Sequence, residues 1–213
     1  MTAKNILIIN NEKYPNDPGW SPQIEKALKK IDDVQCTVKH FSEISSSLIE
    51  DVNPQSIILT GRVGHHWEPN EIENNYVPKL NILMNVDVPI LGICAGLQLL
   101  AIMHGSTVGK MHESEENILE EGYIEHTIVK EDDIFAGLNK TFYCRQFHRD
   151  EVKEIPDEFE LLASSDMCKV QVLKHTSKPI YGVQFHPEWF NESYPDGKVI
   201  LSNFLNMNKV ESN

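Results

Sequence analysis

Apolar residues recur along the chain in two patterns, which are short continuous runs and longer stretches with helical spacing. Continuous runs at residues 6–9, 56–59 and 88–93 predict strands of a parallel sheet, because strands covered on both faces are apolar throughout. Residues 34–40 predict another strand. Helical spacing predicts helices at 21–31, at 71–84 with a bend or reset near Pro78, and at 196–208, with a weaker helix at 42–50.

The second half of the chain is richer in predicted strands, at 123–129, 142–147, 161–164, 169–174 and 180–184. Strands that alternate with helices indicate βαβ units, so we expect an α/β fold with a mostly parallel, doubly wound sheet and flanking helices. A length of 213 residues fits one domain, residues 1–213. An acidic stretch with few apolar residues predicts a solvated face; it contains Glu113, Glu115, Glu116, Glu120 and Glu121.

Cys94 stands where a predicted buried strand changes into a predicted helix. Gly92 and Gly96 flank it at two residues on either side, which is the glycine pattern of a nucleophile elbow. At a helix start the positive end of the helix dipole favours the thiolate. The alternative is that Cys94 is a small buried apolar residue, as most free cysteines are.

A base for such a nucleophile is available near the end of the last predicted strand. Residues 182–188 read Gly-Val-Gln-Phe-His-Pro-Glu, so His186 follows a strand and Glu188 comes two residues later. His186 would take the thiol proton and Glu188 would orient the imidazole. Thr60, Cys94 and His186 each follow a predicted strand, and parallel strands bring their carboxyl ends to one edge of the sheet.

Residues 92–98 and 182–188 together resemble the two signature motifs of class I glutamine amidotransferases. Residues 148–152, 162–166, 168–170 and 178–181 are similar to the glutaminase subunit of GMP synthase, most closely the separate-subunit form of archaea. The resemblance implies a flavodoxin-like fold and glutamine hydrolysis through a Cys94 thioester, with no cofactor. It also implies a separate ATP-dependent synthetase subunit that uses the ammonia, in the closest case to convert XMP to GMP.

The tetrahedral intermediate of this reaction needs donors for its oxyanion, and the backbone N–H of Ala95 is one candidate. The resemblance places the second donor in the turn at residues 60–64, where Arg62 replaces the usual glycine. Its guanidinium would then point to the pocket mouth and pair with a second carboxylate of a γ-glutamyl substrate. The alternative is that Arg62 reaches solvent or a local acid such as Glu68.

Four residues are expected to bind the substrate by resemblance: Gln98, Gly64, Phe147 and His148. Gln98 lies one helical turn after Cys94, and its alternative is a buried helix glutamine. Phe147 stands where serine or asparagine is usual. Two other functions stay open, namely a free-standing γ-glutamyl hydrolase acting on a larger substrate and a non-catalytic regulatory module of the same fold.

Charge and cysteine content exclude several other classes of protein. A net charge of −13 argues against nucleic acid and anionic membranes as partners. The four cysteines form no CxxC pair, which indicates neither a zinc site nor a disulfide framework and fits a cytoplasmic protein. The apolar run at 6–9 is too short for a signal sequence or a membrane span. His65 and His66 beside Glu68 could mimic a metal site, but we expect solvated histidines and no metal.

Overall fold

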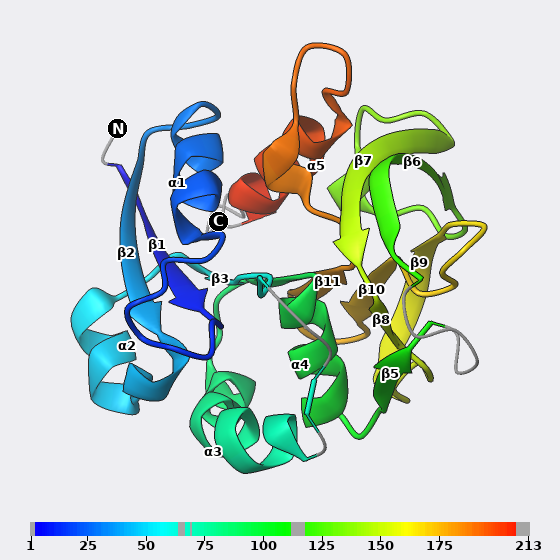
Figure 1. The fold of residues 1–213 in the computed structure, drawn as a ribbon. Coiled ribbons are helices and arrows are strands. Elements are labelled where there is room, and N and C mark those ends of the chain that lie inside the picture. Colours follow the sequence, from blue (N-terminus) through cyan, green and yellow to red (C-terminus); the bar gives the residue numbers. More distant parts are fainter. Residues whose placement is uncertain (1–2, 64–66, 69, 112–117, 208–213) are drawn as a thin grey trace.

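A nine-stranded sheet forms the centre of the computed structural model, which describes residues 3–63, 67–68, 70–111 and 118–207 (Figure 1). The strand order is β2-β1-β3-β4-β11-β10-β9-β6-β7. The strands of this sheet are β1 (Lys4–Asn10), β2 (Val34–His40), β3 (Ser56–Leu59), β4 (Ile90–Ile93), β6 (Glu120–Ile128), β7 (Thr141–His148), β9 (Phe159–Ser164), β10 (Val172–His175) and β11 (Ile180–Val183).

The sheet has a parallel half and an antiparallel half. Strands β2, β1, β3, β4 and β11 pair in parallel, whereas β10, β9, β6 and β7 pair antiparallel with their neighbours. The connection between β10 and β11 spans only residues 176–179, and so short a link joins antiparallel neighbours. The α/β class and the β-rich second half are therefore confirmed, in a mixed sheet.

Helices cover both faces of the sheet. The α-helices are α1 (Ser21–Lys29), α2 (Ser46–Val52), α3 (Val77–Leu80), α4 (Ala95–Met103) and α5 (Asp196–Asn206). In Figure 1, α1 and α5 lie on one side of the sheet and α3 and α4 on the other. Along β1, Ile6 and Ile8 join the core that contains α1 and α5, while Leu7 and Ile9 join the core that contains α3 and α4. This two-sided burial explains the continuous apolar runs.

The predicted helix at 71–84 is a series of three short helices. A π-helix (Ile72–Tyr76) precedes α3, and a 3-10 helix (Asn81–Asn85) follows it. Pro78 lies in the first turn of α3, where its missing N–H does no harm, so the predicted reset is confirmed. The weaker helix at 42–50 is a 3-10 helix (Phe41–Glu43) followed by α2.

A second, two-stranded sheet was not predicted. It pairs β5 (Val108–Lys110) with β8 (Asp150–Val152) and lies beside the carboxyl end of β7. Two further 3-10 helices, Asp133–Phe135 and Pro187–Trp189, connect the larger elements. Among the residues that the structure describes, no helix is long and apolar enough to cross a membrane.

The prediction that the acidic stretch is a solvated face is wrong for Glu120. Its side chain is 0% exposed, and in the register of β6 and β7 it lies opposite His148. Glu121, the next residue, is exposed. Local composition could not show this, because the histidine that accompanies Glu120 comes from another strand. Glu113, Glu115 and Glu116 lie outside the described residues.

Candidate active site

Cys94 forms a sharp corner between β4 and α4. Its backbone has φ 52° and ψ −106°, a conformation that residues other than glycine rarely adopt. The structure leaves no room for a side chain at the two flanking glycines. A Cβ on Gly92 would lie 2.5 Å from the backbone of Gly96, and a Cβ on Gly96 would lie 2.5 Å from the carbonyl oxygen of Leu59. The predicted elbow is present, and backbone strain at Cys94 is part of it.

His186 and Glu188 form a buried pair beside this corner. Nδ1 of His186 lies 2.8 Å from Oε1 of Glu188, and both side chains are at most 2% exposed. A carboxylate only accepts hydrogen bonds, so Nδ1 carries a proton and Nε2 is left to accept one. Nε2 is buried and has no hydrogen-bond partner among the described residues.

The surroundings of His186 favour its protonated form. Burial alone lowers the pKa of the imidazole, but the Glu188 carboxylate and the Cys94 sulfur outweigh burial and raise the pKa above its usual value. The same interaction shows that the sulfur lies within electrostatic reach of the ring. A thiol and an imidazole placed in this way can exchange a proton, which leaves a thiolate beside an imidazolium.

The turn after β3 closes over these two side chains. A Cβ on Gly61 would lie 2.8 Å from Cε1 of His186 and 3.5 Å from Cβ of Cys94, so only a glycine fits there. The ring of Trp20, at the start of α1, covers His186 from another side, with 5.3 Å between the ring centroids. Trp20 was not among the predicted site residues, because no local motif connects it to His186.

A small cavity of about 50 Å³ opens beside Cys94. Its walls include five of the residues predicted for the oxyanion or substrate sites, namely Arg62, Ala95, Gln98, Phe147 and His148. Gly64, the remaining predicted residue, lies outside the described residues. A volume of this size holds a few water molecules.

Gln98 uses its side-chain amide to bond two residues of the cavity wall, Trp67 and Asp150, and also Gln184. Its Oε1 accepts from Nε1 of Trp67 at 2.7 Å. Its Nε2 donates to the backbone oxygen of Asp150 at 2.9 Å and to Oε1 of Gln184 at 3.3 Å. Both donors are occupied, so only one lone pair of Oε1 remains for a substrate amino group. Gln98 therefore lines the pocket and is also a satisfied buried glutamine.

His148 enters the cavity wall with both ring nitrogens facing acceptors. Nδ1 lies 3.0 Å from the backbone oxygen of Asp150, and Nε2 lies 2.6 Å from Oε2 of Glu120. Two acceptors are satisfied when both nitrogens carry protons, as in an imidazolium. Burial raises the pKa of Glu120, but hydrogen bonds from His148, Ser165 and Gln171 and the charge of His148 outweigh it and lower the pKa. The pair is thus a buried ion pair.

Comparison with known proteins gives the same family as the motifs. Residues 17–207 match the family described as glutamine amidotransferase class-I. This chain belongs to that family. The amidotransferase is also similar to curated proteins that are named as one subunit of glutamine-hydrolyzing GMP synthase.

Two such relatives come from methanogenic archaea. The Methanococcus maripaludis protein is 44% identical over 201 residues, 93% of this chain and 94% of that protein. The Methanocaldococcus jannaschii protein is 46% identical over 125 residues, 59% of this chain and 63% of that protein. A crystal structure of a Thermoplasma acidophilum protein, described as a candidate GMP synthase subunit, matches with a TM-score of 0.79 and 27% identity over 98% of this chain and 95% of that one.

Arg62 is the residue at which this amidotransferase was expected to differ from the usual glycine. Its Nη1 lies 3.0 Å from Oε1 of Glu71, and its Cζ lies 4.6 Å from the centre of the Trp67 ring. Of the two predicted placements, the structure has the pairing with a local acid, and the acid is Glu71. Glu68 pairs with Lys13 instead. The positive charge of Arg62 is therefore already paired with a carboxylate before any substrate binds.

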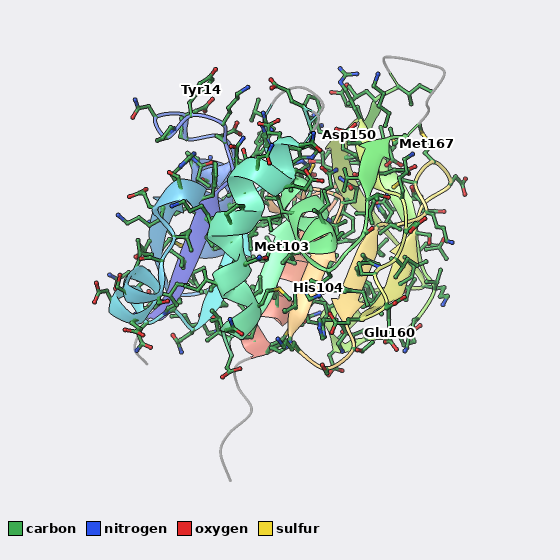
Figure 2. The ribbon with its side chains drawn as sticks, turned by 90° about the horizontal axis from the view of Figure 1, so that it is seen from below. Tyr14, Met103, His104, Asp150, Glu160 and Met167 are labelled. Carbon is green, nitrogen blue, oxygen red and sulfur yellow. The ribbon has the colours of Figure 1, made fainter. Side chains whose placement is uncertain are left out.

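One further group of histidines and a carboxylate lies away from the pocket. His104, Glu158 and His175 bring possible ligand atoms within 4.8 Å of one another. Figure 2 shows His104 well separated from Asp150 of the pocket wall. Nδ1 of His175 accepts the backbone N–H groups of Ser177 and Lys178, so Nε2 carries the proton and has no lone pair for a metal. This group is a hydrogen-bonded cluster. His65 and His66, which were expected to be solvated and to bind no metal, lie outside the described residues.

Proposed function

We propose that this protein hydrolyses glutamine to glutamate and ammonia through a γ-glutamyl thioester on Cys94. The observation that carries the proposal is the strained backbone of Cys94, φ 52°, beside the buried pair of His186 and Glu188. Strain of this kind is maintained where it presents a reacting group. Family membership supports the same chemistry.

The first half of the reaction forms the thioester. His186 takes the proton of the Cys94 thiol at Nε2, while Glu188 holds the proton at Nδ1. The sulfur attacks the side-chain carbonyl carbon of glutamine, and the backbone N–H groups of Ala95 and Arg62 bind the oxyanion. The N–H of Ala95 is suited to this, because the first N–H groups of a helix have no partner within it. His186 then protonates the leaving nitrogen, and ammonia departs.

The second half releases glutamate. His186, now neutral, takes a proton from a water molecule that attacks the thioester carbon. The carbon–sulfur bond breaks, and the sulfur leaves as the thiolate that began the cycle. Gln98, Phe147 and His148 of the cavity wall hold the amino-acid group of the substrate in this scheme, together with Gly64.

The ammonia goes to a separate ATP-dependent synthetase subunit in this proposal, one that converts XMP to GMP. Its support is similarity, over 93% of this chain, to a protein named as a subunit of glutamine-hydrolyzing GMP synthase. The alternative of a free-standing γ-glutamyl hydrolase has less support. That alternative uses Arg62 to bind a second substrate carboxylate, and the charge of Arg62 is already paired with Glu71.

Ammonia release from glutamine tests the proposal, measured with and without a synthetase subunit that carries XMP and ATP. We expect a slow reaction that accelerates when the synthetase is added. Cys94→Ala should abolish it, since loss of a triad nucleophile costs about a million-fold. Cys36→Ala is the matched control and should keep full activity. Turnover by Cys94→Ala would refute the thioester, and fast turnover indifferent to the synthetase would favour the free-standing hydrolase.

A further inference from the structure

We propose that Gln184 is a further catalytic residue, whose side-chain amide donates a hydrogen bond to the sulfur of Cys94 and stabilises its thiolate. The inference rests on the proposed function, since it concerns the same nucleophile. Gln184 is 0% exposed and lies between the end of β11 and His186. Its Nε2 lies 3.5 Å from Sγ of Cys94, which is within hydrogen-bond distance for sulfur.

The orientation of this amide decides whether it helps or harms the thiolate. An amide has an accepting end and a donating end, and the two look alike in outline. The orientation of the Gln98 amide, which contacts Gln184, is fixed by two groups. One of them can only donate a hydrogen bond and the other can only accept one. The indole N–H of Trp67 only donates, so it requires the oxygen of Gln98. The backbone oxygen of Asp150 only accepts, so it requires the nitrogen.

The orientation of Gln98 then determines that of Gln184. Nε2 of Gln98 donates to Oε1 of Gln184 at 3.3 Å, so the oxygen of Gln184 faces Gln98 and its nitrogen faces the sulfur. Turning Gln184 over would place two donors against each other and a carbonyl oxygen against the thiolate. Both contacts would be repulsive, so only one orientation is stable.

Buried charges anchor the far end of this chain of hydrogen bonds. The backbone oxygen of Asp150 that holds Gln98 also accepts from Nδ1 of His148, whose Nε2 is paired with Glu120. The sequence of contacts from Glu120 through His148, Asp150, Gln98 and Gln184 to Cys94 is unbroken. Gln98, His148 and Glu120 are positioning residues in this account, because they act on the sulfur only through Gln184.

The hydrogen bond changes in strength as the reaction proceeds. A thiol sulfur is a weak acceptor, whereas a thiolate makes a charge-assisted hydrogen bond. The N–H of Gln184 therefore favours the state in which the thiol proton has moved to His186. In the thioester the sulfur no longer carries charge, and the bond strengthens again when the thiolate leaves.

The test compares alkylation of Cys94 by iodoacetamide in three variants at one neutral pH. Gln184→Met removes the amide at similar length, and Gln184→Glu places a carboxylate oxygen against the sulfur. Gln146→Met is the matched control, because Gln146 is equally buried on β7 and bonds His126 and Gln171 instead of the sulfur. Iodoacetamide is small and neutral and needs no glutamine site. Thiolate absorbance in the ultraviolet, measured against Cys94→Ala, gives a second readout, and urea unfolding confirms that each variant is folded.

Loss of one such hydrogen bond should lower the thiolate population about tenfold. A less stabilised thiolate is also more nucleophilic, so the alkylation rate should fall by about threefold in Gln184→Met. Gln184→Glu should lose more, and Gln146→Met should match wild type. Equal thiolate absorbance and alkylation rates in wild type and a folded Gln184 variant would overturn the proposal. Failure of the wild type to hydrolyse glutamine would refute the proposed function and leave this comparison intact.

Discussion

At the scale of single residues, the position of each proton determines what the candidate site can do. Glu188 accepts from Nδ1 of His186 at 2.8 Å and so leaves Nε2 free for the thiol proton. Replacing Glu188 by glutamine would let an amide N–H face Nδ1 and favour the wrong tautomer. The base itself would still be present. Removal of His186 takes away the proton acceptor altogether.

We therefore expect Glu188→Gln to lower kcat/KM for glutamine by about 10⁴, as in a comparable triad, and His186→Ala to lower it by about 10⁶. Steady-state ammonia release from purified variants measures both losses. Equal losses would mean that Glu188 does more than orient the imidazole, and no loss in Glu188→Gln would remove it from the triad.

The four cysteines should differ in reactivity, because their surroundings differ. Burial and the nearby Glu25 raise the pKa of Cys36 to about 11, and burial raises the pKa of Cys144 and Cys168 well above the usual range. At neutral pH these three thiols stay protonated and unreactive. A glutamine-analogue alkylator should thus modify Cys94 alone, as read by peptide mass spectrometry. Modification of Cys36 at a comparable rate would contradict this.

Residues within local motifs could be predicted from the sequence, and residues that act through distant contacts could not. Cys94, His186 and Glu188 stand in short segments whose glycines and strand ends set their geometry. Glu120 was predicted to be solvated because its neighbours in sequence are acidic. Its surroundings are instead set by His148, which lies opposite it on another strand. The pairing of Arg62 likewise depends on Glu71, which directly precedes the π-helix and is distant in sequence from any motif of the site.

At the scale of elements, the close packing at the corner between β4 and α4 predicts the effect of a substitution on stability. Gly96→Ala should destabilise the protein by about 1–3 kcal/mol, because its Cβ would overlap the carbonyl oxygen of Leu59, 2.5 Å away. This loss exceeds the ~1 kcal/mol that alanine normally gains over glycine in a helix. The free energy of unfolding in urea measures it. In the control, Gly109→Ala, the new Cβ meets only the flexible Lys153 side chain at 3.3 Å, and a similar loss there would contradict the overlap.

Elements buried on both faces were predictable because burial leaves a continuous apolar run. Strands β3 and β4 match their predicted runs for this reason. Strands β5 and β8 have three residues each, too few for any period to show. β8 nevertheless matters to the site, since the backbone oxygen of Asp150 holds both Gln98 and His148. A backbone oxygen is present in every residue, so the sequence carries no signal for this role.

At the scale of the whole molecule, both halves of the sheet contribute residues to the pocket. The parallel half supplies Cys94 and the turn at Gly61, and the antiparallel half supplies His148 from β7 with Glu120 from β6. The ion pair of Glu120 and His148 lies within the antiparallel half, and the backbone oxygen of Asp150 links His148 to Gln98 on α4. A buried pair of this kind is costly to break, because the remaining charge has no partner.

The lowered pKa of Glu120 predicts how the stabilisation from this buried pair depends on pH. Its folded pKa is lowered, so its stabilisation is complete above the unfolded value of about 4.3 and is lost as the pH falls through the folded pKa. Glu120→Gln should be destabilised at pH 7 by about 3 kcal/mol. That difference from wild type should shrink as the pH approaches the folded pKa. Urea unfolding of both proteins over a pH series measures it.

Glu121→Gln is the matched control for this series. Glu121 is adjacent and exposed, and its contact with Arg145 spans 3.6 Å at the surface, where such pairs contribute little. Its variant should follow wild type at every pH. A constant difference between wild type and Glu120→Gln across the series would mean that the carboxylate is not the stabilising form. The loss would then come from packing, and the charge of the buried pair would not be what stabilises the antiparallel half of the sheet.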